Sequence, residues 1–233
     1  MAGSYKKRRI VILILALVVF AVVIYINTPK IIETIKPITK NETKIITSPA
    51  IDGLNILEVK GRAPKTGYSR EQFGSDWNVT SGCDTRNIIL NRDLVDTKLD
   101  EKCNVVSGLL NDPYTGKPIQ FSRGGETSSA IQIDHVVALS DAWQKGAQQF
   151  TETMRIGLAN DPLELLAVSG PANLQKSDGD AATWLPSNKS FRCSYVARQI
   201  AVKQKYSLWV TQAEHDAIES ILSKCPDQML PIP

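Results

Sequence analysis

The sequence contains few of the residue types from which catalytic and metal-binding sites are usually built. It has two histidines and four cysteines in 233 residues and no Cys-x-x-Cys pair, which argues against a structural zinc site. It also lacks a strong excess of charge, with 27 basic and 24 acidic residues. Four of the basic residues are consecutive at positions 6–9. The rest of the chain is therefore nearly neutral, and charge alone does not indicate nucleic-acid binding.

An uncharged apolar run occupies residues 10–26, directly after the basic cluster. A membrane-spanning helix needs about 17–25 apolar residues, whereas the apolar part of a signal peptide has about 7–15, followed by a small-residue cleavage motif that is not evident here. The pattern predicts a single-pass signal-anchor in the cell membrane. Residues 1–9 would be cytoplasmic, residues 10–26 transmembrane and the C-terminal part extracellular. A cleaved signal peptide, and hence a secreted protein, is the alternative.

Residues 27–56 are rich in Ile, Thr, Lys and Pro without a sustained period, which is typical of a stalk or linker. Residues 57–233 are long enough to enclose a hydrophobic core and are expected to form the extracellular domain. An even number of cysteines in an exported chain favours disulfides over zinc. Three pairings are possible, and proximity in the sequence favours Cys83 with Cys103 and Cys193 with Cys225.

The spacing of apolar residues predicts short strands interleaved with helices. We expect helices over residues 84–94, 140–158, 192–206 and 211–224, a hairpin of strands at 104–110 and 117–122, and strands at 129–139 and 163–168. Gly170 and Pro171 open one further short helix, because proline favours the first helical turn. The predicted fold class is α+β, with more helix than strand.

Asp134 and His135 form an acidic-imidazole pair within the strand expected at 129–139. Neighbouring side chains of an extended strand point to opposite faces, so the two can share one site only where the strand ends or bulges. Asn173 follows on the first turn of the helix after the strand at 163–168. The other histidine, His215, lies in a polar helical segment and is expected at the surface.

The order of a strand with Asp-His, a second strand and a helix with Asn resembles the HNH endonucleases with a ββα-metal core. The sequence is more closely similar to the C-terminal domain of GmrSD-type restriction endonucleases and its exported actinobacterial relatives. The resemblance covers residues 68–222 and rests on the stretches GCDTRN, DPYTG, IQIDHVVALSDAW, NDPLELLAVSGPANLQKSDGDAATWLP and NKSFRCSYVARQ. It implies a small ββα-metal core embedded in helices.

The resemblance implies a role for each residue of this set. Hydrolysis of a phosphodiester needs a base that activates water, and a neutral histidine suits that task near pH 7; this would be His135. It also needs a cation that stabilises charge on the phosphate, held by Asp134 and the amide oxygen of Asn173. One divalent ion is implied, Mg²⁺ first, with Mn²⁺ or Ca²⁺ as alternatives.

The sequence departs from the family at the position that normally carries an asparagine to orient the base. Counting nine residues back from Asn173 leads to Glu164. A glutamate can accept a proton from the imidazole ring and hold its tautomer, or favour the protonated ring, which cannot act as a base. It can also approach the metal. Asn160 is the alternative for the orienting position if the count of nine residues does not apply to this chain.

Further polar residues are candidates for contacts with substrate or metal. Lys176 is expected to contact phosphate and, with His135 and Glu164, to be a catalytic residue. Arg86 and Arg123 are candidate phosphate clamps, the latter in a Ser-Arg-Gly-Gly stretch whose glycines permit close approach to a ligand. Asp178 or Asp180 is either a third metal ligand or a solvated turn residue.

The sequence therefore predicts a membrane-anchored extracellular endonuclease that hydrolyses DNA, or RNA, with one divalent cation. Nucleic acid and the membrane are the expected partners, and no protein partner is evident. A non-catalytic nucleic-acid-binding module of the same fold is the first alternative, supported by Glu164 at the orienting position. A metal phosphodiesterase that acts on another phosphate ester is the second.

Overall fold

The computed structural model describes residue 15 and residues 17–23, 49–124 and 128–231. The expected cytoplasmic tail, much of the apolar run at 10–26 and residues 27–48 of the expected stalk lie outside these ranges. Residue 15 and residues 17–23 are helical. Within the described part of the chain, no helix combines the length and apolar character needed to cross a membrane. The chain divides into two units, Met1–Ile45 and Ile46–Pro233, and the second carries all the elements named below.

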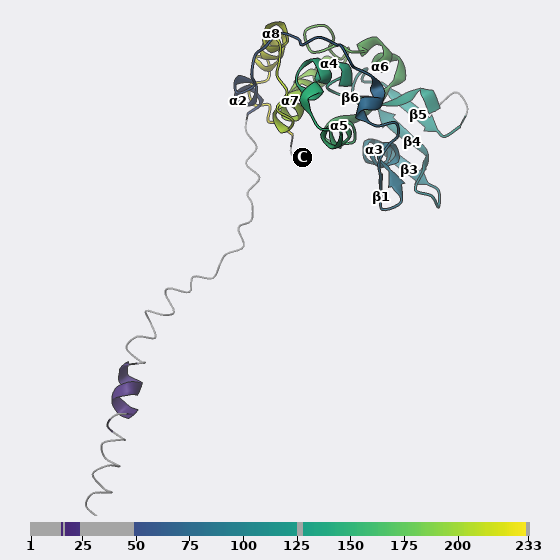
Figure 1. The fold of residues 1–233 in the computed structure, drawn as a ribbon. Helices are drawn as coiled ribbons and strands as arrows, with labels where there is room; N and C mark the ends of the chain where they lie inside the picture. The colour runs from purple at the N-terminus through teal and green to yellow at the C-terminus, as the bar shows by residue number, and fades with distance from the viewer. Residues whose placement is uncertain (1–14, 16, 24–48, 125–127, 232–233) are drawn as a thin grey trace, which may run out of the picture. The chain divides into compact units, whose positions relative to one another are not determined.

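The second unit has the mixed α+β architecture that the sequence predicts (Figure 1). Its α-helices are α2 (Ala50–Asn55), α3 (Thr85–Asp93), α4 (Leu139–Gln144), α5 (Glu152–Ala159), α6 (Gly170–Lys176), α7 (Arg192–Lys205) and α8 (Gln212–Leu222). Its short 3-10 helices are η1 (Arg70–Phe73), η3 (Ala147–Gln149) and η4 (Lys189–Phe191). Its strands are β1 (Val79–Thr80), β2 (Cys83–Asp84), β3 (Leu94–Leu99), β4 (Val105–Asn111), β5 (Pro118–Ser122), β6 (Ile131–His135) and β7 (Leu165–Ser169).

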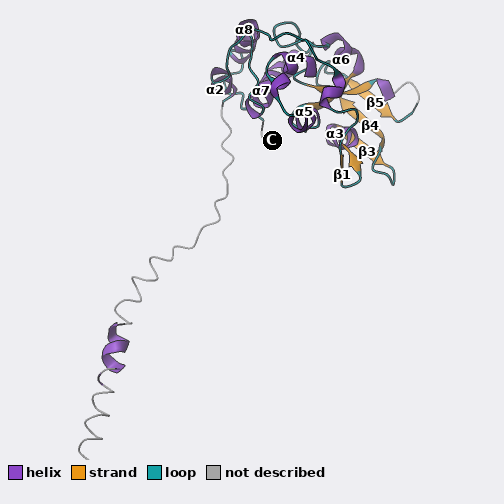
Figure 2. Cartoon of the chain, in the orientation of Figure 1, coloured by secondary structure: helices purple, strands orange, loops and turns teal. Residues whose placement is uncertain are grey.

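Within the described residues, the strands form the antiparallel sheets β1–β2, β3–β4–β5 and β6–β7. Figure 2 shows β3–β5 gathered on one side of the unit and α2, α7 and α8 on the other. In the β6–β7 pair, Ile131 lies opposite Ser169 and His135 lies opposite Leu165. Helix α6 begins directly after β7, so these two strands and the helix form a ββα arrangement.

Strand β7 is buried along its whole length because a hydrophobic cluster covers each of its faces. Leu165 and Ala167 belong to the cluster that includes residues of α3 and β3–β5. Leu166 and Val168 point the other way, as the alternation of a strand requires, and belong to the cluster formed with the helices. The β6–β7 pair is therefore held between two cores, which fixes the end of β6 where the Asp-His pair lies.

The prediction of one continuous helix at 140–158 is wrong, because the chain forms three separate elements there, α4, η3 and α5. The interruption falls at Gly146, whose φ of 130° is a conformation that other residues rarely adopt. The expected strand at 129–139 ends at His135, and Leu139 already begins α4. Helix α2, within the range assigned to the stalk, packs against α7 and α8 with Ala50 and Leu54 fully buried.

Both predicted disulfides are confirmed. Cys83 pairs with Cys103, and Cys193 pairs with Cys225. The first bond ties β2 to the turn between β3 and β4, and the second ties the start of α7 to the chain just after α8. Cys193 and Cys225 also pack against the hydrophobic cluster formed with the helices, and both bridges stabilise the fold by limiting the freedom of the unfolded chain.

Candidate active site

Asp134, His135 and Asn173 line one cavity of about 260 Å³. The Asp-His pair can share it because β6 ends at His135, so the alternation of the strand no longer separates the two side chains. Asn173 reaches it from α6. The cavity is lined by Tyr68, Arg70, Asp134, His135, Ala138, Leu139, Asn173, Leu174, Ser177 and Asp178.

The imidazole of His135 is oriented by a backbone carbonyl. Its Nε2 lies 3.0 Å from the carbonyl oxygen of Ala159, which can only accept, so Nε2 carries the proton and Nδ1 keeps a lone pair. The indole of Trp77 stacks on the ring with centroids 5.9 Å apart. Burial, and then the positive charge of Arg70, lower the pKa of His135 to about 3, although the Ala159 carbonyl acts in the opposite direction. The ring is therefore neutral and can accept a proton.

The carboxylate of Asp134 is 5% exposed and is held by two donors. The ammonium of Lys176 lies 2.9 Å from Oδ1, and the hydroxyl of Tyr114 donates to Oδ2. Burial raises the pKa of Asp134 even though Lys176 and Tyr114 act to lower it. Lys176 also donates to the carbonyl of His135 at 2.8 Å and is itself 2% exposed. The expected contact of Lys176 with phosphate therefore gives way to a contact with Asp134, and Lys176 does not line the cavity.

Asn173 is positioned by the close approach of α6 to β6. Ser169 caps the helix by accepting from the amide of Ala172. A Cβ on Gly170 would lie 2.4 Å from the carbonyl oxygen of Ser129, so only glycine permits this approach. The Asn173 side-chain amide donates to Gln132 at 2.9 Å. Its side-chain oxygen has no donor among the residues that the structure describes.

The donor set at the cavity suits a hard divalent cation. A carboxylate oxygen can accept more than one contact, so Asp134 retains capacity, and the free oxygen of Asn173 is a second ligand of the type that Mg²⁺ prefers. Asp178 also lines the cavity, but its carboxylate pairs with Lys65 at 2.8 Å. Asp180 does not line it. Of the two aspartates considered as a third ligand, only Asp178 is thus near the other donors.

Glu164 does not contact the imidazole. It is fully buried, and its Oε2 accepts from the amide of Val137 at 3.2 Å, which braces the turn just after His135. Burial raises the pKa of Glu164 well above its ordinary value, so the neutral acid is favoured. Asn160, the alternative for the orienting position, accepts from the amide of Asn78 and donates to a carbonyl of α5. A backbone carbonyl fills the orienting role, and no residue type in the sequence signals it.

The two expected phosphate clamps are engaged with the protein itself. Arg86 donates to the carbonyl of Ile131 at 3.4 Å. Arg123 donates to the carbonyl of Val105 at 2.9 Å and to the side chain of Asn87. Neither arginine lines the cavity. Tyr68 and Arg70 do so, and neither belongs to a sequence motif that indicates chemistry.

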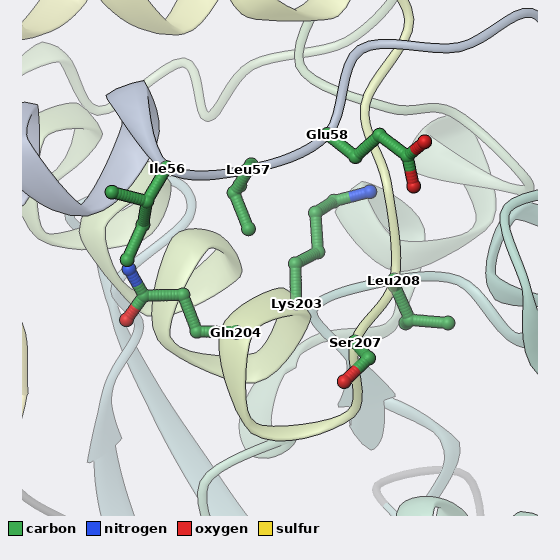
Figure 3. A pocket seen from close by; sticks show the side chains of 7 residues that line it. All are labelled: Ile56, Leu57, Glu58, Lys203, Gln204, Ser207 and Leu208. Carbon is green, nitrogen blue, oxygen red and sulfur yellow. The ribbon is translucent and has the colours of Figure 1, made fainter.

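A second cavity of about 260 Å³ lies where the chain after α2 meets α7 (Figure 3). Figure 3 shows the side chain of Lys203 rising from α7 toward the segment of Leu57 and Glu58. Lys203 is fully buried and pairs with Glu214 at 3.0 Å. None of the residues selected from the sequence lines this cavity.

Comparison with known proteins places the site within a known family. The model of the GmrSD restriction endonuclease C-terminal domain matches residues 84–220, a segment that includes Asp134, His135 and Asn173. A protein of Arthroderma benhamiae, named only as an uncharacterized secreted protein, is 36% identical over 174 residues, which cover 74% of this chain and 82% of the relative. No solved structure matches the chain. The family match indicates a nuclease-type domain.

The membrane localisation expected from the sequence is contradicted by the comparison, because the Arthroderma benhamiae relative is named as a secreted protein. The apolar run at 10–26 favours an anchor because it is longer than the apolar part of a signal peptide and reaches the lower limit for a membrane span.

Proposed function

The chain belongs to the family of GmrSD restriction endonuclease C-terminal domains, and on this premise we propose that it is a metal-dependent nuclease that hydrolyses phosphodiester bonds of DNA. The observation that carries the proposal is the meeting of Asp134, His135 and Asn173 in one cavity. A neutral imidazole can serve as the general base, and the carboxylate and amide oxygens can hold the cation that such hydrolysis uses.

His135 is the general base of the proposed reaction. Its Nε2 is occupied by the Ala159 carbonyl, which leaves Nδ1 to remove a proton from the attacking water. The charge of Arg70 and the burial of the ring keep the imidazole neutral in the resting enzyme. Glu164 holds the turn that follows His135 through the amide of Val137, so it positions the base without touching it.

Asp134 and Asn173 would hold one divalent cation, with Mg²⁺ as the first candidate. When bound, this ion would stabilise the negative charge that develops on the phosphate and on the leaving oxygen. Lys176 and Tyr114 fix the carboxylate of Asp134 from the protein side. Gln132 fixes the amide of Asn173 in the same way, so both ligands are positioned before a metal arrives.

We place this activity outside the cell. Two disulfides are typical of proteins that fold in an oxidising compartment, and the name of the Arthroderma benhamiae relative agrees with secretion. The first alternative function is a non-catalytic DNA-binding module. Its main support is Glu164 at the orienting position, but a backbone carbonyl contacts the ring of His135 where the family has an asparagine side chain.

The experiment compares the full-length protein with His135→Ala on plasmid DNA in Mg²⁺ or Mn²⁺. We expect cleavage that a chelator abolishes and that the variant reduces by about 10²–10⁴-fold, since this is the contribution of a general base. His215→Ala, which changes the other histidine of the chain, is the matched control and should cut normally. Equal cleavage by His135→Ala would refute the assignment of the base.

The alternatives give different outcomes. DNA binding by the wild-type protein without cleavage in any divalent ion would indicate the binding module. Hydrolysis of small phosphodiesters without cleavage of DNA or RNA would indicate another phosphate ester as the substrate.

A further inference from the structure

The chain before the segment matched by the family model forms one wall of the candidate active site. Residues 58–73, here called the strap, precede that segment. The amide of Lys60 donates to the carbonyl of Val210 at 2.9 Å, and the amide of Ala63 donates to the carbonyl of Gln144 at 2.8 Å. The strap is thereby fixed across the chain ahead of α8 and the end of α4.

Ion pairs tie the strap to α4 and to the turn that follows α6. The guanidinium of Arg62 lies 2.9 Å from Asp141 and 2.7 Å from Asp180. The ammonium of Lys65 lies 2.8 Å from Asp178, which itself lines the cavity. These contacts bring the strap to the edge of the cavity a few residues before Tyr68 and Arg70.

The far end of the strap is anchored in the core. Phe73 is 1% exposed, and its ring packs edge-on against Trp143, with centroids 6.4 Å apart. Arg155 of α5 donates to the carbonyl of Gln72 at 2.9 Å. The short η1 helix that carries Arg70 is therefore held on both sides, and the position of Arg70 at the cavity follows from the fold.

Arg70 differs from the other basic residues of the strap. Arg62 and Lys65 are paired with aspartates, whereas Arg70 is exposed and makes no hydrogen bond or ion pair with a described residue. Among the described residues that line the cavity, it is the one that carries a permanent positive charge. A guanidinium without a partner presents several N–H donors that match the oxygens of a phosphate.

We propose that Arg70 binds a phosphate of the substrate and that the strap is part of the active site, although it precedes the segment that the family model matches. This rests on the proposed function and deepens it, because it names the residue that holds the phosphodiester beside His135. Arg70 takes the role that the sequence predicts for Arg86 and Arg123, both of which donate to carbonyl oxygens of the protein.

The test measures DNA binding in the His135→Ala background, so that binding is read without cleavage. Fluorescence anisotropy with a short labelled duplex in Mg²⁺, across a series of salt concentrations, compares this protein with the additional changes Arg70→Ala and Arg70→Lys. Arg70→Ala should weaken binding by about tenfold and lower the slope of log affinity against log salt by about 0.9, since one phosphate contact is lost. Arg70→Lys should keep the slope and lose part of the affinity.

The matched control is Lys102→Ala, which removes an exposed positive charge in the turn between β3 and β4, away from the strap. It should leave both affinity and salt slope unchanged. Circular dichroism checks that each variant is folded, which we expect because Arg70 is exposed. If Arg70→Ala matches the control in affinity and slope, the proposal is overturned.

Two other outcomes separate this inference from the function on which it rests. Binding that depends on Arg70, together with a wild-type protein that cuts no DNA, would sustain the phosphate contact and refute the nuclease. A protein that fails to bind DNA even at low salt would refute both.

Discussion

Two groups of buried carboxylates in this domain differ in how many positively charged side chains contact them. In the first, here called the lysine cluster, Lys145 is fully buried and contacts Asp141 at 2.7 Å, Asp180 at 2.9 Å and Glu214 at 2.6 Å. Lys203 and Arg62 contact the same carboxylates. At the cavity, by contrast, Asp134 has one ammonium partner, Lys176.

The pKa values of the carboxyl groups reflect this difference. Burial alone would raise the pKa of Asp180, but the hydrogen bond and charge of Lys145, and then Arg62, lower it to about 2. For Asp134, burial outweighs Lys176 and Tyr114, and the pKa is raised. In the lysine cluster, the positive side chains balance the buried carboxylates, and the group is structural. At the cavity, Asp134 has less positive charge around it, and this is where we propose that a cation binds.

The largest effect on stability is expected from Lys145→Met. The change leaves the buried carboxylates of Asp141, Asp180 and Glu214 without their shared partner, and breaking a buried ion pair costs about 3–5 kcal/mol. Urea denaturation followed by circular dichroism measures the loss. Lys60→Met is the control, because Lys60 forms an exposed pair with Glu58 that contributes about 1 kcal/mol or less. Equal stability of the two variants would show that the cluster is not structural.

A smaller loss is expected from Lys176→Met. Asp134, whose pKa is already raised, can become protonated when its partner is removed, so the cost should be about 1–3 kcal/mol. The rate of DNA cleavage should fall by more than the loss of folded protein explains, since a protonated Asp134 is a poor metal ligand. The exposed Lys189→Met provides the control for both measurements. If the folded fraction of Lys176→Met cleaves DNA as fast as the wild-type protein, the role given to Asp134 is contradicted.

The comparison also shows which parts of the structure could be predicted from sequence. The ordered motif was sufficient to select Asp134, His135 and Asn173, and local patterns were sufficient for α7, α8 and the hairpin of β4 and β5. The disulfides followed from proximity. These features depend on neighbouring residues, and such signals are present in the sequence itself.

The remaining features depend on contacts between distant segments. The carbonyl of Ala159 orients His135 from 24 residues away, and a backbone carbonyl has no residue signature. Arg70 lies in the cavity because the strap is anchored by Arg62 and Phe73, neither of which marks a site by itself. The place of Lys176 near Asn173 in the sequence predicts a contact with phosphate, but α6 directs its side chain inward to Asp134.

The smallest effect on DNA cleavage is expected from Glu164→Gln, and its effect on stability has the opposite sign to that of the lysine variants. The pKa of Glu164 is raised in the folded protein, so the folded state binds this proton more tightly than the unfolded chain. Its contribution is therefore fully present below the unfolded pKa of about 4.3 and is lost as the pH rises toward the folded pKa. Glutamine is neutral at every pH and can still accept from the amide of Val137.

Glu164→Gln should therefore be more stable than the wild-type protein at pH 7 and close to it at pH 4. Each unit by which the pKa is raised corresponds to about 1.4 kcal/mol. Thermal melting across this pH range measures the difference, and Glu219→Gln, at an exposed position on α8, should show no such trend. DNA cleavage should be retained, because Glu164 braces the turn after His135 through a contact that glutamine preserves. A loss of cleavage in a stable Glu164→Gln protein would contradict this bracing role and show that the carboxylate itself takes part in the reaction.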